Sequence, residues 1–85
     1  MTEFNYTITD EVGIHARPAG LLVKEAKQYD ASIKIECGGK SADAGKLMAI
    51  MGLGVKKGDT VKVTVDGDDE LLIADKLEKF FKENL

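Results

Sequence analysis

Apolar and polar residues alternate in three segments of the chain, which predicts three β-strands. In residues 4–8, 33–37 and 61–65 every second side chain is apolar, so each strand would have one buried face. Gly38-Gly39 follows the second segment as a hairpin signal. Residues 40–43 are therefore predicted to form a short returning strand beside it.

The apolar spacing changes to a helical one in three other segments. In residues 16–27 a stripe of Ala16, Ala19, Leu22, Val23 and Ala26 predicts an amphipathic helix. Pro18 suits its first turn, where a missing N–H has no cost. Residues 46–53 predict a short helix that ends at Gly52 and Gly54. A last helix is predicted at the C-terminal end, with these residues facing inward: Ile73, Ala74, Leu77, and Phe80 or Phe81.

The resulting element order is βαββαβα, which indicates an α+β fold. Strands with one apolar face favour a four-stranded antiparallel sheet, and helices with one apolar stripe must cover it. We therefore expect an open-faced sandwich with three helices on one face of the sheet. The length of 85 residues fits one domain, residues 1–85.

Composition excludes several classes of protein. A net charge of -3 argues against a general nucleic-acid binder, which would carry a strong positive excess. The single cysteine, Cys37, forms no disulfide framework and is expected to be a small buried apolar residue. No signal peptide and no apolar run of about 20 residues is visible, so we expect a cytoplasmic protein without membrane insertion. A monomer is the default expectation, because the sequence carries no oligomer signal.

The segment from Gly13 to Ala19 carries the clearest chemical signal. His15, the only histidine, lies just before a predicted helix, whose unpaired N–H groups and positive dipole end favour anions. Arg17 could donate charge-assisted hydrogen bonds to a phosphoryl group on His15. A neutral imidazole is nucleophilic near pH 7. From position alone, a lone histidine before a helix is more often a cap or surface residue, and no cluster with ligand spacing indicates a metal.

The helix at residues 46–53 is apolar almost all round. A short surface helix can bury only one side, so Leu47, Met48 or Met51 would stay exposed, and an exposed methionine patch suits several partners. The other interpretation is a fully buried helix with methionine as core filler.

The two segments together resemble the HPr family, the histidine phosphocarriers of the bacterial phosphoenolpyruvate:sugar phosphotransferase system. The resemblance runs the full chain and includes these motifs: Gly13-Ile14-His15-Ala16-Arg17-Pro18-Ala19, Val23-Lys24-Glu25-Ala26, Gly39-Lys40-Ser41-Ala42, Met48, Met51 and Leu53-Gly54. The family's open-faced sandwich agrees with the element order predicted above.

The resemblance implies a stoichiometric phosphotransfer protein, not a stand-alone enzyme, that needs no cofactor. It implies that enzyme I, charged by phosphoenolpyruvate, phosphorylates His15 on Nδ1, and that His15 donates to the IIA domain of a sugar permease. Arg17 matches the arginine that supports the phosphoryl group. Leu47, Met48 and Met51 match the surface on which both partners dock.

Three positions depart from the family pattern. Lys46 stands where many members have a regulatory serine, so the resemblance implies no serine phosphorylation, and Ser41 is not expected to replace it. Gly45 precedes it where lysine is frequent, and could cap the helix. Val12 replaces a polar neighbour of the histidine.

Two alternatives to a general sugar phosphocarrier stay open. One is a carrier for a specialised branch, such as a dihydroxyacetone kinase system, and the other is an HPr-like regulatory binding module.

Overall fold

A computed structural model of the chain describes residues 1–11, 13–14 and 16–85. Its elements follow the predicted order, with these bounds: β1 Thr2–Thr7, α1 Ala16–Lys27, β2 Ala31–Cys37, β3 Lys40–Asp43, α2 Leu47–Met51, β4 Thr60–Gly67 and α3 Glu70–Asn84. The predicted fold class is confirmed. The short helix is the main difference in bounds, since it is one turn of five residues.

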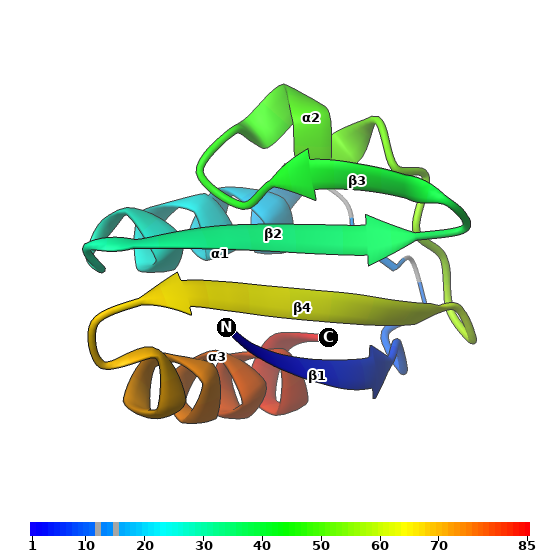
Figure 1. Cartoon of the computed structure of the whole chain (residues 1–85). Helices are drawn as coiled ribbons and strands as arrows, with labels where there is room; N and C mark the ends of the chain where they lie inside the picture. Colours follow the sequence, from blue (N-terminus) through cyan, green and yellow to red (C-terminus); the bar gives the residue numbers. More distant parts are fainter. Residues whose placement is uncertain (12, 15) are drawn as a thin grey trace.

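The four strands form one antiparallel sheet in the order β1-β4-β2-β3, with helices behind it (Figure 1). The central strand β4 pairs with β1 on one side and β2 on the other. Its three valines are fully buried, and Val63 lies opposite Phe4 on β1 and Ile35 on β2. Apolar cross-strand pairs on one face explain why the alternation in the sequence produces this register.

Phe81 of α3 lies at the centre of the core. Its ring makes edge-on contacts with Phe4, Tyr6 and Phe80, at centroid distances of 6.0, 5.6 and 6.2 Å. Phe81 is fully buried and Phe80 only partly, so Phe81 is the inward aromatic residue of the pair. The helical stripe of α3 thereby closes over β1 and β4.

Cys37 at the end of β2 is only partly buried, contrary to the expectation of a fully buried residue. Partial burial raises the pKa of its thiol, and the nearby Asp59 carboxylate adds to this effect. The cause is its place on the last residue of the strand, beside the exposed Gly38-Gly39 turn.

Tyr29 and Glu25 form a hydrogen bond at the end of α1. The Tyr29 hydroxyl donates to Glu25 Oε2 over 2.6 Å. Desolvation, and after it this hydrogen bond, raises the pKa of Tyr29 from 10.0 to about 12. The phenol must stay protonated to donate, so the stabilisation is present below pH 10 and is lost as pH rises through about 12.

We expect Tyr29→Phe to lower the free energy of unfolding by about 1 kcal/mol at neutral pH, the net value of one hydrogen bond. The difference from the parent protein should shrink as the pH rises from 10 to 12. Urea unfolding at stepped pH measures it. A difference that stays constant over that range would contradict the assignment.

Candidate functional site

The loop that leads into α1 is joined to the segment before β4 by main-chain hydrogen bonds. Ile8 N donates to Asp59 O and Gly58 N to Ile8 O, both over 2.9 Å, while Ile14 N donates to Val55 O over 3.2 Å. Ile14 and Val55 are both buried. Residues 8 and 14 are therefore held against the segment of residues 55–59.

The end of the chain fixes the same loop from the other side. The main-chain oxygen of Leu85 accepts hydrogen bonds from Thr9 N at 2.6 Å, Asp10 N at 2.8 Å and Thr9 Oγ1 at 3.0 Å. Leu85 is itself buried. These contacts hold the C-terminal end of α3 against residues 9 and 10, which lie next to the start of α1.

Gly13 has the conformation and the space that only glycine fits here. Its φ is +80°, and a Cβ built on it would lie 2.3 Å from Val55 O and 2.7 Å from Lys56 Cα. The backbone angle of Gly13 is one that glycine adopts without strain, and the group that approaches it closely is the protein's own backbone at residues 55–56.

We expect Gly13→Ala to cost at least about 2 kcal/mol of stability, since the left-handed conformation is unfavourable and the backbone at residues 55–56 must also move. Gly39→Ala is the matched control. Its φ is +82°, but nothing lies within 4 Å of the added Cβ. Urea unfolding should show a clearly larger loss of stability for Gly13→Ala than for Gly39→Ala. Equal losses would mean that the backbone at residues 55–56 moves away from the added Cβ at no cost.

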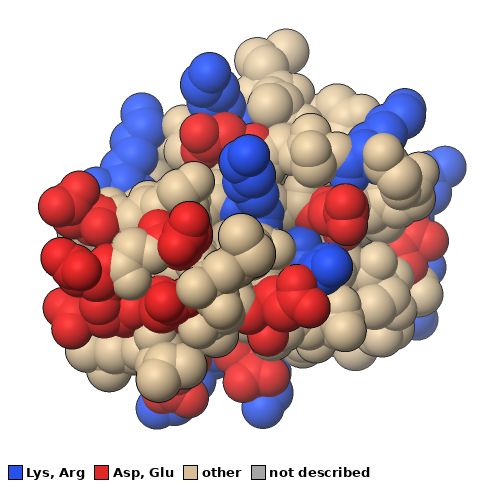
Figure 2. Space-filling view, viewed as in Figure 1, with Lys and Arg blue, Asp and Glu red and all other residues tan. Residues whose placement is uncertain are grey.

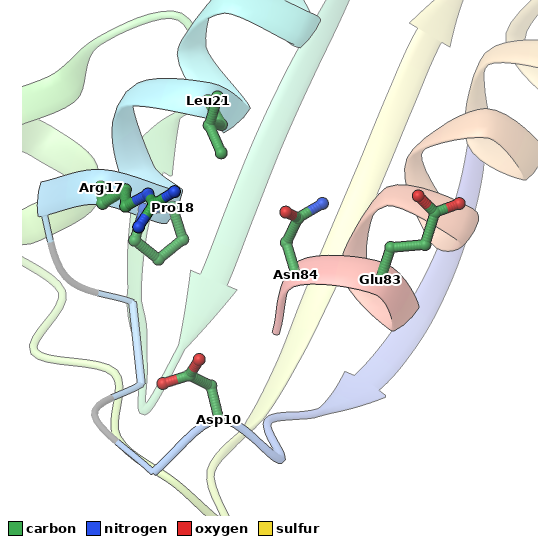
Figure 3. Close-up of a pocket in the computed structure, with 6 residues that line it drawn as sticks. All are labelled: Asp10, Arg17, Pro18, Leu21, Glu83 and Asn84. Carbon is green, nitrogen blue, oxygen red and sulfur yellow. The ribbon is translucent and has the colours of Figure 1, made fainter.

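Arg17 is exposed in the first turn of α1. It lines a hollow of about 380 Å³ between α1 and the end of α3. Figure 3 shows Arg17, Pro18 and Leu21 on the α1 side, and the side chains of Asp10, Glu83 and Asn84 across from them. The guanidinium thus lies at an open surface close to the end of the loop.

Charge along α1 follows the helix dipole at one end only. The last turn carries Lys24 and Lys27, which complement the negative C-terminal end. The first turn contains no acidic residue, so no carboxylate of that turn neutralises the positive end. Together with Arg17, this end of the helix favours an incoming anion.

The three predicted docking residues are all exposed on α2. Met48 has 79% of its surface exposed, Leu47 39% and Met51 38%, whereas Ile50 is fully buried. The interpretation of a fully buried helix is therefore wrong, because a one-turn helix turns only one side inward. α2 contacts α1, so this apolar surface lies beside the helix that carries Arg17.

Lys46 is exposed and occupies the N-cap position of α2, with its carbonyl accepting from Ile50 N over 3.1 Å. The expectation that Gly45 caps the helix is wrong. Gly45 lies one residue earlier, where its N–H donates to Asp43 Oδ1 over 2.8 Å. A turn at residues 43–45 thus takes the place of a side-chain cap.

Two of the residues singled out in the sequence, His15 and Val12, lie outside the described residues. The structure adds four residues around the hollow at Arg17 that the sequence did not indicate: Asp10, Leu21, Glu83 and Asn84. Leu21 is 45% exposed. Its position one step off the buried stripe at Leu22 was the available signal, but nothing in the sequence brings residue 83 next to residue 17.

Within residues 1–11, 13–14 and 16–85, no helix is long and apolar enough to cross a membrane. Within that same part, no group of three or more His, Cys, Asp and Glu side chains could hold a metal ion.

The chain matches a family model over residues 2–83, the PTS-HPr family, described as the PTS HPr component phosphorylation site. It is similar to HPr from Thermoanaerobacter tengcongensis, with 36% identity, TM-score 0.93, and coverage of 99% of this chain and 94% of that one. For the histidine-containing phosphocarrier protein of Mycoplasma the identity is 30%, the TM-score 0.92, and the coverage 96% and 93%.

A third similar structure is Crh, the Bacillus subtilis catabolite repression protein, which was solved as a swapped dimer. It is 30% identical, with a TM-score of 0.78 and coverage of 100% of this chain and 98% of that one. The family match spans nearly the whole chain. The chain therefore belongs to the HPr family, the phosphocarrier proteins of the phosphotransferase system.

Proposed function

We propose that this protein carries a phosphoryl group on His15, which it accepts from phosphorylated enzyme I and passes to the IIA domain of a sugar permease. In the first step a neutral imidazole nitrogen of His15 attacks phosphorus. The new P–N bond forms as the bond to enzyme I breaks, and the electron pair of that bond stays with enzyme I. In the second step a nucleophile of the IIA domain attacks phosphorus. The P–N bond breaks as the new bond forms, and its electron pair returns to the imidazole of His15.

The observation that carries the proposal is the setting of the helix start that follows His15 in the sequence. Arg17 is exposed there, and no carboxylate lies in the first turn. A phosphoryl group at this point would gain a guanidinium donor and the positive end of the helix dipole.

Leu47, Met48 and Met51 form the docking surface in this proposal. Flexible thioether side chains adapt to different partners, which suits a surface that both the donor and the acceptor must use. Because the two partners would bind the same residues, they would exclude each other, and the carrier would shuttle between them.

Phosphorus NMR tests the proposal directly. The protein is incubated with enzyme I, Mg²⁺ and phosphoenolpyruvate, and we expect one phosphate per chain that is labile in acid and stable in hydroxide. Absence of this signal with a competent enzyme I would favour the alternative, an HPr-like regulatory binding module. The similarity to Crh is the observation that supports that alternative.

We further propose that the protein has no regulatory serine phosphorylation, because Lys46 occupies the position of that serine in the family. The exposed Lys46 would instead attract acidic partners to α2. A kinase for that serine should therefore leave the chain unmodified, as intact-mass measurement would show.

Lys46→Glu is expected to slow association with enzyme I about tenfold at low salt, and the effect should shrink as salt is added. Stopped-flow binding measures this rate. Lys34→Glu, the same charge change on the exposed face of β2, is the control and should change the rate much less. Equal rates for the parent protein and Lys46→Glu would contradict the role given to Lys46.

A further inference from the structure

A second exposed apolar surface lies at the opposite end of α1 from Arg17. Leu71 is 74% exposed and Leu72 55%, and both belong to the first turn of α3. The buried stripe of α3 begins only at Ile73. Neither leucine therefore serves the core, and neither belongs to the docking surface on α2.

Two adjoining hollows flank these leucines. One, of about 430 Å³, lies between the end of α1 and the start of α3 and includes Tyr29 and Asp30; the other, of about 590 Å³, lies beside Thr2 and Leu71. Asp68, Asp69 and Leu72 line both. The leucines are thus part of a shaped surface, which we call the acidic end, consisting of Asp30, Asp66, Asp68, Asp69, Leu71 and Leu72.

Negative charge surrounds the apolar centre of the acidic end. Figure 2 shows carboxylates gathered over the end of β4 and the start of α3, at the left of the view. The N-terminal amine pairs with Glu70 at 2.7 Å and with Asp66 at 3.8 Å. Within the described residues, Asp30, Asp68 and Asp69 have no cation within 4 Å, and Lys76 is the one lysine that lines either hollow.

The side chain of Asp69 takes no part in capping the helix that it precedes. Asp69 holds the N-cap position of α3 with φ +58°, and its side chain makes no capping hydrogen bond. An aspartate at this position normally accepts from the first turn. Its carboxylate is left at the surface, together with that of Asp68.

The charges decide which kind of partner can cover the leucines. A neutral apolar partner would strip water from three carboxylates without replacing it, which is costly. An anionic lipid surface or the same face of a second copy would repel them. A partner with lysine or arginine around an apolar stripe would pair the carboxylates while it buries the leucines.

We propose that the acidic end is a second docking surface, for a protein segment that presents a basic amphipathic helix. α1 has 12 residues, which at 1.5 Å each is about 18 Å, and it separates Arg17 from the hollow that Gln28 lines. A partner at the acidic end therefore leaves Arg17 and α2 uncovered. The carrier could stay tethered while it exchanges phosphoryl groups at its other end.

The test uses a synthetic helical peptide with a leucine stripe flanked by lysines, titrated into the ¹⁵N-labelled full chain at low ionic strength. Amide shifts should concentrate at residues 28–30 and 66–73. Leu71→Ser with Leu72→Ser should weaken binding about tenfold. Asp68→Asn with Asp69→Asn should weaken it to a similar extent at low salt and lessen its salt dependence.

The matched control is Leu47→Ser with Met48→Ser, which removes exposed apolar surface from α2 and should leave peptide affinity unchanged. Leu71 and Leu72, like Leu47 and Met48, are exposed, so both double variants should keep the parent fold, as their amide spectra would show. Shifts concentrated on α2, or an unchanged affinity after the Leu71 and Leu72 substitutions, would overturn the proposal. So would self-association of the parent chain, seen by light scattering, that those substitutions abolish.

Phosphoryl transfer separates this proposal from the proposed function. The Leu71 and Leu72 substitutions should leave transfer from enzyme I unchanged, because neither residue is near Arg17. Retained transfer with lost peptide binding supports a separate surface. Failure of His15 to accept phosphate would leave the peptide result, and thus this inference, intact.

Discussion

Replacing His15 by alanine is expected to abolish phosphate transfer from enzyme I to this protein. No other histidine is present in the sequence to take its place. The expected result is complete loss, because the substitution removes the nucleophile itself and not a group that assists it. Intact-mass measurement after incubation with enzyme I and phosphoenolpyruvate should show no added phosphate.

Arg17→Ala is the control that separates the acceptor from its support. It keeps the imidazole and removes one charge-assisted donor, which corresponds to a rate loss of about ten- to a hundredfold. Phosphate should therefore still be added to Arg17→Ala, but slowly. Phosphate on His15→Ala would place the phosphoryl group elsewhere in the chain. An unchanged rate for Arg17→Ala would mean that Arg17 does not support the phosphoryl group.

Phe81→Ala is expected to cost about 3–5 kcal/mol of stability, a large share of the roughly 5–15 kcal/mol that holds a small domain folded. Phe81 is fully buried and contacts three other aromatic rings. The substitution leaves a cavity beneath β1 and β4 that backbone relaxation fills only in part. Urea unfolding, with the change in midpoint and slope recorded, measures the loss.

Phe80→Ala removes the same number of atoms from the neighbouring position of α3 and serves as the control. Phe80 is only partly buried, so its loss should be clearly smaller. Equal losses would mean that burial at Phe81 does not set the stability of this core. The main chain also connects Phe81 to the candidate site. Leu85 N donates to Phe81 O over 2.7 Å, and Leu85 O accepts from residues 9 and 10.

The two proposed docking surfaces differ in the charge around their apolar residues. α2 presents exposed apolar side chains next to the basic residue Lys46, whereas the acidic end presents leucines among carboxylates. Partners for one surface are therefore unsuited to the other. The small net charge of -3 conceals this separation, because opposite local charges cancel in the sum.

The sequence by itself determined the element order and most of the inward residues, although Ala16 of the predicted α1 stripe is exposed. Periods of two and of about four residues report directly which side of a strand or helix is apolar. The bounds of the longer elements followed from the same pattern and from Gly and Pro. The one-turn helix was predicted too long, because the apolar run at residues 47–53 continues past the last helical residue, Met51.

Only the tertiary structure decided which residues from distant parts of the chain meet. The hollow at Arg17 joins residues 10 and 17 to residues 83 and 84, and the acidic end joins residue 30 to residues 66–72. Periodicity within one segment carries no information on the neighbours of its exposed side chains. Sheet order and helix packing set those neighbours, and they bring together surfaces that a linear pattern keeps apart.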